Sequence, residues 1–189
     1  LNGGEPLPIT EDGSYNFSTT VAHNASYEVT IASTPAGQGC TIANASGTVT
    51  APVANVDVTC SSDTFTVGGD VSGLTGSVDL QLNGSTTQTI TADGSFEFAS
   101  NPVLYGTDYE VTIASQPTGQ TCSVSNGSGT MTAAVTDVAV SCSTDTYTIG
   151  GTVSGATGAF QLELAGGATE TLDISGDGTY QFTAAVAHG

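Results

Sequence analysis

The chain repeats itself with a period of 82 residues, and both of its cysteine pairs fall on that period. Residues 27–33 (Tyr-Glu-Val-Thr-Ile-Ala-Ser) recur in the same phase as residues 109–115. The cysteine pairs are Cys40 with Cys60 and Cys122 with Cys142. A repeat of this length indicates an array of small domains instead of one large core, and such arrays span, stiffen or display more often than they catalyse.

Within one period the apolar residues alternate in strand fashion and are separated by turn residues. Asp93-Gly94 predicts a hairpin, because both turn residues tolerate positive φ, and Gly68-Gly69 predicts a bulge or a switch between sheets. Seven or eight short strands without a helical pattern predict an all-β fold, an antiparallel β-sandwich. The expected strands are residues 64–71, 77–82, 87–91, 95–98, 109–115, 120–125, 130–132 and 137–142.

The period divides the chain into one complete and two partial units. Residues 1–63 lack the first two strands, residues 64–145 are complete, and residues 146–189 hold the first strands only. The connections, residues 61–63 and 143–145, are too short to act as flexible tethers, so we expect a stiff rod. Because the partial units overlap within the repeat, we expect a window on a longer array. The expected partners are neighbouring repeats or, alternatively, copies of the chain that exchange strands head to tail.

Lysine and arginine are absent, against 18 aspartates and glutamates and a formal net charge of −18. Nucleic-acid binding requires cations that displace phosphate counterions, so it is excluded. A Walker lysine, a Schiff-base lysine and a basic membrane patch are excluded as well. No apolar run approaches the roughly 20 residues of a membrane span, so no membrane insertion is expected in this segment.

The periodic cysteines predict one disulfide per repeat, Cys40–Cys60 and Cys122–Cys142, with buried free thiols as the alternative. In the chain-entropy model each bridge stabilises its loop by about 3 kcal/mol. Disulfides imply an oxidising compartment, so we expect the chain to be extracellular or at the cell surface.

Two stretches carry a resemblance to known families. Residues 147–155 (Tyr-Thr-Ile-Gly-Gly-Thr-Val-Ser-Gly), followed by residues 177–182 (Asp-Gly-Thr-Tyr-Gln-Phe), resemble the prealbumin-like or Cna-B-like sandwiches of bacterial surface proteins. Residues 116–122 (Gln-Pro-Thr-Gly-Gln-Thr-Cys), through Cys142, are similar to tandem Ig-like repeats of very large bacterial secreted or surface proteins. Many Cna-B-type domains carry a Lys–Asn isopeptide bond. This lysine-free chain cannot form one, and the disulfides are expected to take its place.

The side chains do not suggest an enzyme. His23 and His188 occupy equivalent loops in which the middle unit has Tyr105, so a ring over a strand edge is preferred to a catalytic or metal-binding histidine. No serine lies in a nucleophile elbow. Three aspartates each precede a glycine and are interpreted as turn residues: Asp12, Asp93 and Asp177.

The cofactor considered is Ca²⁺, which needs six to eight oxygen ligands. Asp63 and Asp145 lie at the junctions between units, and Asp70 is a further candidate ligand by fold-back of its strand. The third unit has Thr152 in place of Asp70, which weakens the hypothesis. Turn capping by aspartate is the alternative, and no other cofactor is expected.

These features predict a structural repeat segment of an extracellular bacterial stalk, adhesin or fibre. The first alternative is a module that binds a glycan or a protein on a surface. The absence of tryptophan disfavours this alternative, because sugar sites commonly use exposed aromatic side chains. The second alternative is an accessory domain of a large secreted hydrolase.

Overall fold

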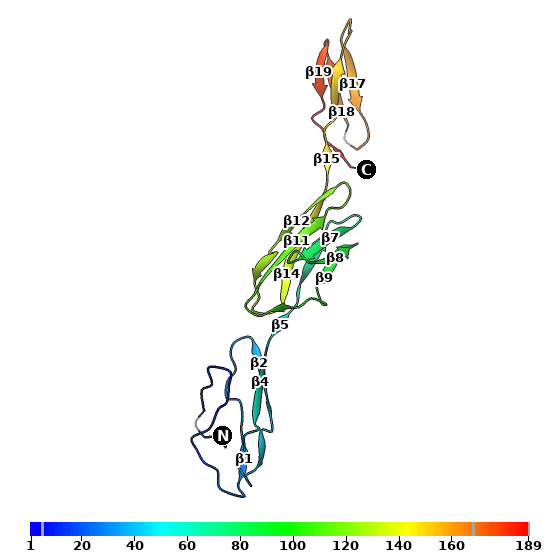
Figure 1. Ribbon diagram of the computed structural model, residues 1–189. Coiled ribbons are helices and arrows are strands. Elements are labelled where there is room, and N and C mark those ends of the chain that lie inside the picture. Colours follow the sequence, from blue (N-terminus) through cyan, green and yellow to red (C-terminus); the bar gives the residue numbers. More distant parts are fainter. Residues whose placement is uncertain (5, 168, 189) are drawn as a thin grey trace.

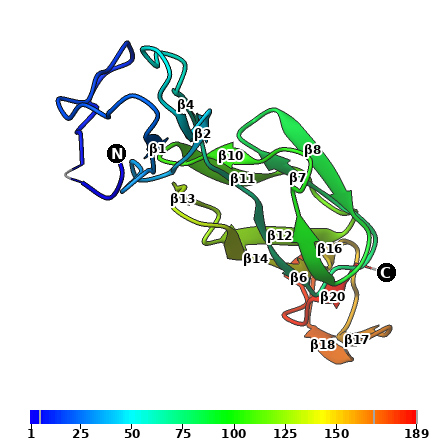
Figure 2. The ribbon, with the colours of Figure 1, turned by 90° about the horizontal axis from the view of Figure 1, so that it is seen from below.

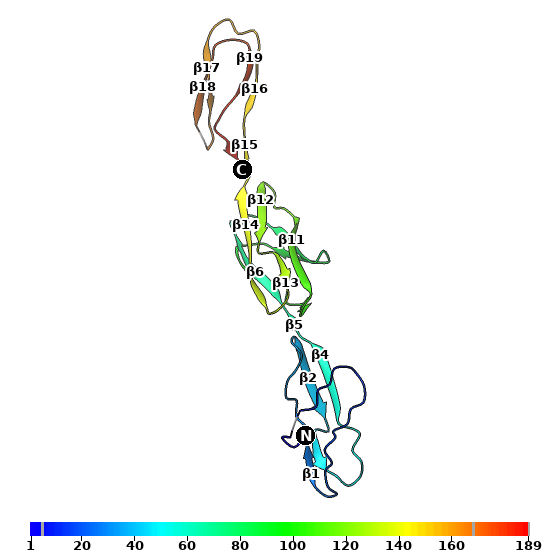
Figure 3. The same ribbon diagram turned by 90° about the vertical axis from the view of Figure 1, so that its left-hand side faces the viewer.

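The computed structural model describes residues 1–4, 6–167 and 169–188, so Gly189, the last residue of the third expected unit, lies outside it. The described residues form β-strands and no helix. None of this part of the chain therefore offers a helix long and apolar enough to cross a membrane. Figures 1 and 3, two views at right angles, show three segments that follow one another end to end. We call them the N-terminal (1–63), middle (64–145) and C-terminal (146–188) segments.

The strands are short and follow the expected spacing. Those of the N-terminal segment are β1 (Ser26–Glu28), β2 (Gln38–Ala43), β3 (Ser46–Thr48) and β4 (Asp57–Ser62). Those of the middle segment are β5 (Thr64–Phe65), β6 (Val67–Ser72), β7 (Val78–Leu82), β8 (Thr86–Ile90), β9 (Gly94–Glu97), β10 (Val103–Leu104), β11 (Asp108–Ser115), β12 (Gln120–Ser125), β13 (Ser128–Thr130) and β14 (Val135–Thr144). Those of the C-terminal segment are β15 (Thr146–Tyr147), β16 (Gly150–Val153), β17 (Phe160–Leu164), β18 (Glu170–Ile174), β19 (Gly178–Gln181) and β20 (Val186–Ala187).

The middle segment consists of two four-stranded sheets, ordered β13-β11-β7-β8 and β12-β14-β6-β9, with β5 and β10 paired at one end. Side chains from both sheets form one apolar cluster. The residues expected to point inward are buried, which confirms the alternating pattern: Val67, Val71, Val78, Leu80, Leu82, Phe96, Phe98, Tyr109, Val111, Val138 and Val140. Met131, fully buried, joins them.

One strand pair differs from the antiparallel prediction. β6 and β14 are parallel neighbours, with Val71 opposite Val140. β6 begins where the chain enters the middle segment and β14 ends where it leaves at the opposite end, as Figures 1 and 3 show. The first and last strands of a segment that is entered at one end and left at the other run in the same direction, so their pairing is parallel.

The predicted Asp93-Gly94 hairpin is also wrong. β8 lies in the sheet of β7, whereas β9 pairs with β6 in the other sheet, so this connection crosses between the sheets. Gly94 has the positive φ, 134°. The Asp93 carboxylate instead accepts hydrogen bonds from the N–H groups of Gly73 (3.0 Å) and Leu74 (2.7 Å) and holds the loop after β6. The aspartate thus serves a distant loop and not a tight hairpin.

Two strand boundaries are shifted. The strand expected at residues 130–132 is β13, two residues earlier, because Asn126 turns the chain with a φ of 54° and Ser128 is already opposite Glu110. The strand expected at 64–71 is divided into β5 and β6, which pair with different strands. The predicted irregularity near the Gly68-Gly69 pair is present as a register shift in β14, opposite β6.

The N- and C-terminal segments form pairs of strands. β1 pairs with β3 and β2 with β4; β15 pairs with β20, β16 with β19 and β17 with β18. Few of their apolar side chains are buried among the described residues: Val29 in the N-terminal segment, and Ile174 and Phe182 in the C-terminal one. The apolar core therefore lies in the middle segment.

Candidate functional site

The two junctions between segments have the same main-chain geometry. The Asp63 N–H donates to the carbonyl of Gly37 (2.8 Å), and its carbonyl accepts from the Tyr105 N–H (2.9 Å). One period later, the Asp145 N–H donates to Gly119 (2.9 Å), and its carbonyl accepts from the His188 N–H (2.9 Å). Each aspartate thus extends the ladder of the preceding segment with its N–H and that of the following segment with its C=O.

This geometry leaves a single residue between consecutive segments. β4 ends at Ser62 and β5 begins at Thr64, so Asp63 alone separates them. Asp145 alone separates β14 from β15 in the same way. The connections expected to span three residues are therefore shorter, because the last strand of each segment extends through the two residues that follow its second cysteine.

An aromatic ring from the following segment covers a glycine at each junction. Gly37 and Gly119 have φ values of 72° and 71°. A methyl group added at Gly37 would have three ring atoms of Tyr105 as its nearest neighbours, the farthest at 2.7 Å. A methyl group added at Gly119 would meet the His188 ring, with Nε2 at 2.6 Å. His23, the third member of this position, is exposed.

The aspartate side chains differ between the junctions. Oδ1 of Asp145 accepts a hydrogen bond of 2.7 Å from Oγ1 of Thr121. The first junction has Gly39 in the place of Thr121, and a Cβ built there would lie 3.7 Å from Oδ1 of Asp63. Residue 39 therefore has room for the hydroxyl that the second junction uses.

Replacing Gly39 by threonine is expected to stabilise the first junction by about 1 kcal/mol. Gly39 lies in β2, where threonine has the higher strand propensity, and the new hydroxyl can donate to Asp63. Exchange protection of the Asp63 amide measures the effect. Gly39→Ala is the matched control, since it adds a side chain without a donor. Equal protection in the two variants would show that the hydroxyl makes no bond to Asp63.

The calcium candidates do not form a cluster. In the described ranges, no three His, Cys, Asp or Glu side chains lie close enough together to hold a metal ion. Asp70 belongs to β6, opposite Ser95, and borders a groove of the middle segment. At the junctions, Asp63 and Asp145 act through hydrogen bonds, which is the capping role given as the alternative.

The four cysteines form two disulfides, Cys40–Cys60 and Cys122–Cys142. In each pair the cysteines are directly opposite one another on neighbouring antiparallel strands, β2 with β4 and β12 with β14. Each bridge therefore reinforces the hairpin that ends at a junction, and it does not tie the two sheets together. Disulfides indicate a non-reducing environment.

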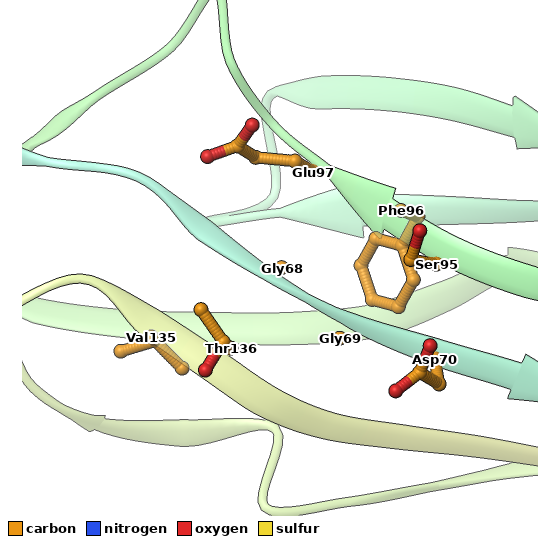
Figure 4. A pocket seen from close by; sticks show the side chains of 8 residues that line it. All are labelled: Gly68, Gly69, Asp70, Ser95, Phe96, Glu97, Val135 and Thr136. Carbon is orange, nitrogen blue, oxygen red and sulfur yellow. The ribbon is translucent and has the colours of Figure 1, made fainter.

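The groove beside Asp70 offers little for catalysis. Figure 4 shows it between β6, β9 and β14, with Gly68 and Gly69 as its floor. Its polar side chains are those of Asp70, Ser95, Glu97 and Thr136. The lining contains a serine hydroxyl and two carboxylates but no histidine to take up the proton of a nucleophile.

Two carboxylates of the C-terminal segment are held by backbone N–H groups. Asp177 accepts hydrogen bonds from Ala156 (2.7 Å) and Gly155 (2.8 Å), as Asp93 does in the middle segment. Glu170 accepts from the Ala184 N–H (2.6 Å). Because these bonds favour the charged form, the pKa of both carboxyl groups is lowered, from 3.8 for aspartate and 4.5 for glutamate.

We expect acid to loosen the C-terminal segment first at these carboxylates. A depressed pKa adds stability that is fully present above the ordinary value and is lost as the pH falls through the lower folded-state value. Hydrogen exchange of the Gly155 and Ala156 amides, corrected for intrinsic rates, should accelerate between about pH 5 and pH 2. Asp177→Asn should remove most of this pH dependence. An unchanged pH profile in the variant would contradict the assignment.

The sequence signals missed the ring-on-glycine contact, although its parts were visible. Gly37-Gln38 and Gly119-Gln120 recur two residues before the first cysteine of each repeat, and Tyr105 and His188 recur in phase with them. Figure 2, a view turned by 90° from that of Figure 1, also places β20 of the C-terminal segment close to the middle segment. No protein-family model, curated protein or solved structure matches this chain.

Proposed function

We propose that the chain is a structural segment of an extracellular rod built from tandem Ig-like β-sandwiches, of the kind found in bacterial stalks, adhesins and fibres. The observation that carries the proposal is the main-chain geometry shared by the two junctions. The same four-residue arrangement of hydrogen bonds joins consecutive segments at Asp63 and at Asp145. A connection that repeats its geometry places each segment in the same way relative to the last.

Composition supports this function. A chain without lysine or arginine presents no cleavage site for trypsin-like proteases, and its negative charge keeps neighbouring rods apart in solution. The disulfides strengthen hairpins that bear the junctions. In this proposal the segment carries no catalytic centre, and its partners are further repeats at either end.

Charge repulsion alone is a competing explanation of an elongated shape, and salt separates the two. Small-angle scattering of the chain should give an elongated profile that stays the same from about 0.01 M to 1 M salt, over which the Debye length falls from roughly 30 Å to 3 Å. A profile that becomes compact as salt is added would show flexible connections and would refute the rod.

A further inference from the structure

The contact between the aromatic ring and the glycine crosses each junction, so it belongs to two segments at once. Gly37 lies in the turn before β2 of the N-terminal segment, whereas Tyr105 follows β10 of the middle segment. Gly119 and His188 stand in the same relation between the middle and C-terminal segments. The His188 ring also lies 6.4 Å from that of Tyr147, centroid to centroid.

The turn that receives the ring requires glycine for two reasons. Its positive φ is unfavourable for residues that carry a Cβ. The ring of the next segment also occupies the space that a Cβ would fill. The sequence of the receiving turn is Gly-Gln-x-Cys in both cases, with x being Gly39 or Thr121.

The occupant is defined by its shape. Tyrosine at the first junction and histidine at the second share a planar ring and little else, so the contact depends on a flat face lying on the glycine Cα and not on a charge or a particular donor. The main-chain bonds of Asp63 alone form a single line about which the segments could turn. The ring provides a second point of contact beside that line.

We propose that the ring of residue 105 or 188, seated on the glycine of a Gly-Gln-x-Cys turn, is the joint that fixes the orientation of each segment relative to the preceding one. This inference rests on the proposed rod and assigns its stiffness to one interface. The partner of each ring is a turn of the same kind in the neighbouring repeat.

The test compares two glycines that have the same backbone strain but different surroundings. Gly84, with a φ of 66°, has no atom within 4 Å of a built Cβ, so Gly84→Ala adds strain without displacing a ring. Gly37→Ala adds similar strain and displaces the Tyr105 ring. Residual dipolar couplings of β2 and β4, and of β6 and β14, should fit one alignment tensor in the wild-type chain and in Gly84→Ala. In Gly37→Ala they should need two.

Variants of the ring keep the test decisive if Gly37→Ala disturbs its own turn. Tyr105→Ala should separate the two alignment tensors, whereas Tyr105→His, the ring of the second junction, should keep one. A single tensor in both Gly37→Ala and Tyr105→Ala would overturn the joint and leave the rod intact. Separation in Gly84→Ala as well would assign the effect to strain and also overturn the joint. Two tensors in the wild-type chain would refute the rod itself.

Discussion

Replacing Gly69 by alanine is expected to destabilise the middle segment by about 3 kcal/mol or more, a large share of the 5–15 kcal/mol of a typical domain. The three atoms nearest the new methyl group would be the main-chain O, C and N of Val138, all within 2.7 Å. β14 cannot move away, because it is bonded to β6 on one side and to β12 on the other. Denaturant unfolding followed by the methyl signals of Leu80 and Val140 measures the loss.

Gly158→Ala is the control for this substitution, since a Cβ there has no atom within 4 Å and its φ is not in the left-handed region. Its effect should stay within about 0.5 kcal/mol. If Gly69→Ala were as mild as Gly158→Ala, the close approach of β6 and β14 would be incorrect.

Removing the Cys122–Cys142 disulfide by a double alanine substitution should destabilise the middle segment by about 3 kcal/mol, the loop-closure entropy that a separation of 20 residues implies. The same unfolding experiment on Leu80 and Val140 measures this effect. The Cys40–Cys60 bridge has the same separation and provides a matched comparison in another segment. Its removal should loosen β2 and β4 but leave the unfolding of the middle segment unchanged.

Equal losses in the middle segment for the two double variants would contradict this account. They would mean that the segments unfold as one cooperative unit. Unequal losses would show that each bridge acts within its own segment.

The strand faces could be predicted from the sequence because alternation is a local property. Val78, Leu80 and Leu82 alternate with polar residues wherever β7 lies in the fold, and all three are buried. The cysteine pairing followed from the repeat period. These features depend on residues close together in the sequence or on exact recurrence along it.

The sheet to which each strand belongs could not be read in this way. Asp93-Gly94 has the residues of a hairpin turn, but its flanking strands join different sheets, a choice made by packing around Phe96 and Leu80. The parallel pairing of β6 with β14 follows from where the chain enters and leaves the segment. Neither property is encoded in a short run of residues.

The junctions were located by the repeat period but not understood from it. Asp63 and Asp145 suggested a metal because carboxylates stand out in a sequence, whereas their main-chain bonds have no side-chain signal. The recurrence of a glycine 82 residues on, together with an aromatic residue at the equivalent loop, was the available clue.

The central claim is that consecutive segments are held in a fixed orientation. Residual dipolar couplings of the wild-type chain test it most directly, measured on β2 and β4, on β6 and β14, and on β16 and β19. The account predicts that one alignment tensor fits all three segments, at low and at high salt. Three independent tensors with different magnitudes would contradict it, because they would show that the segments reorient freely about Asp63 and Asp145.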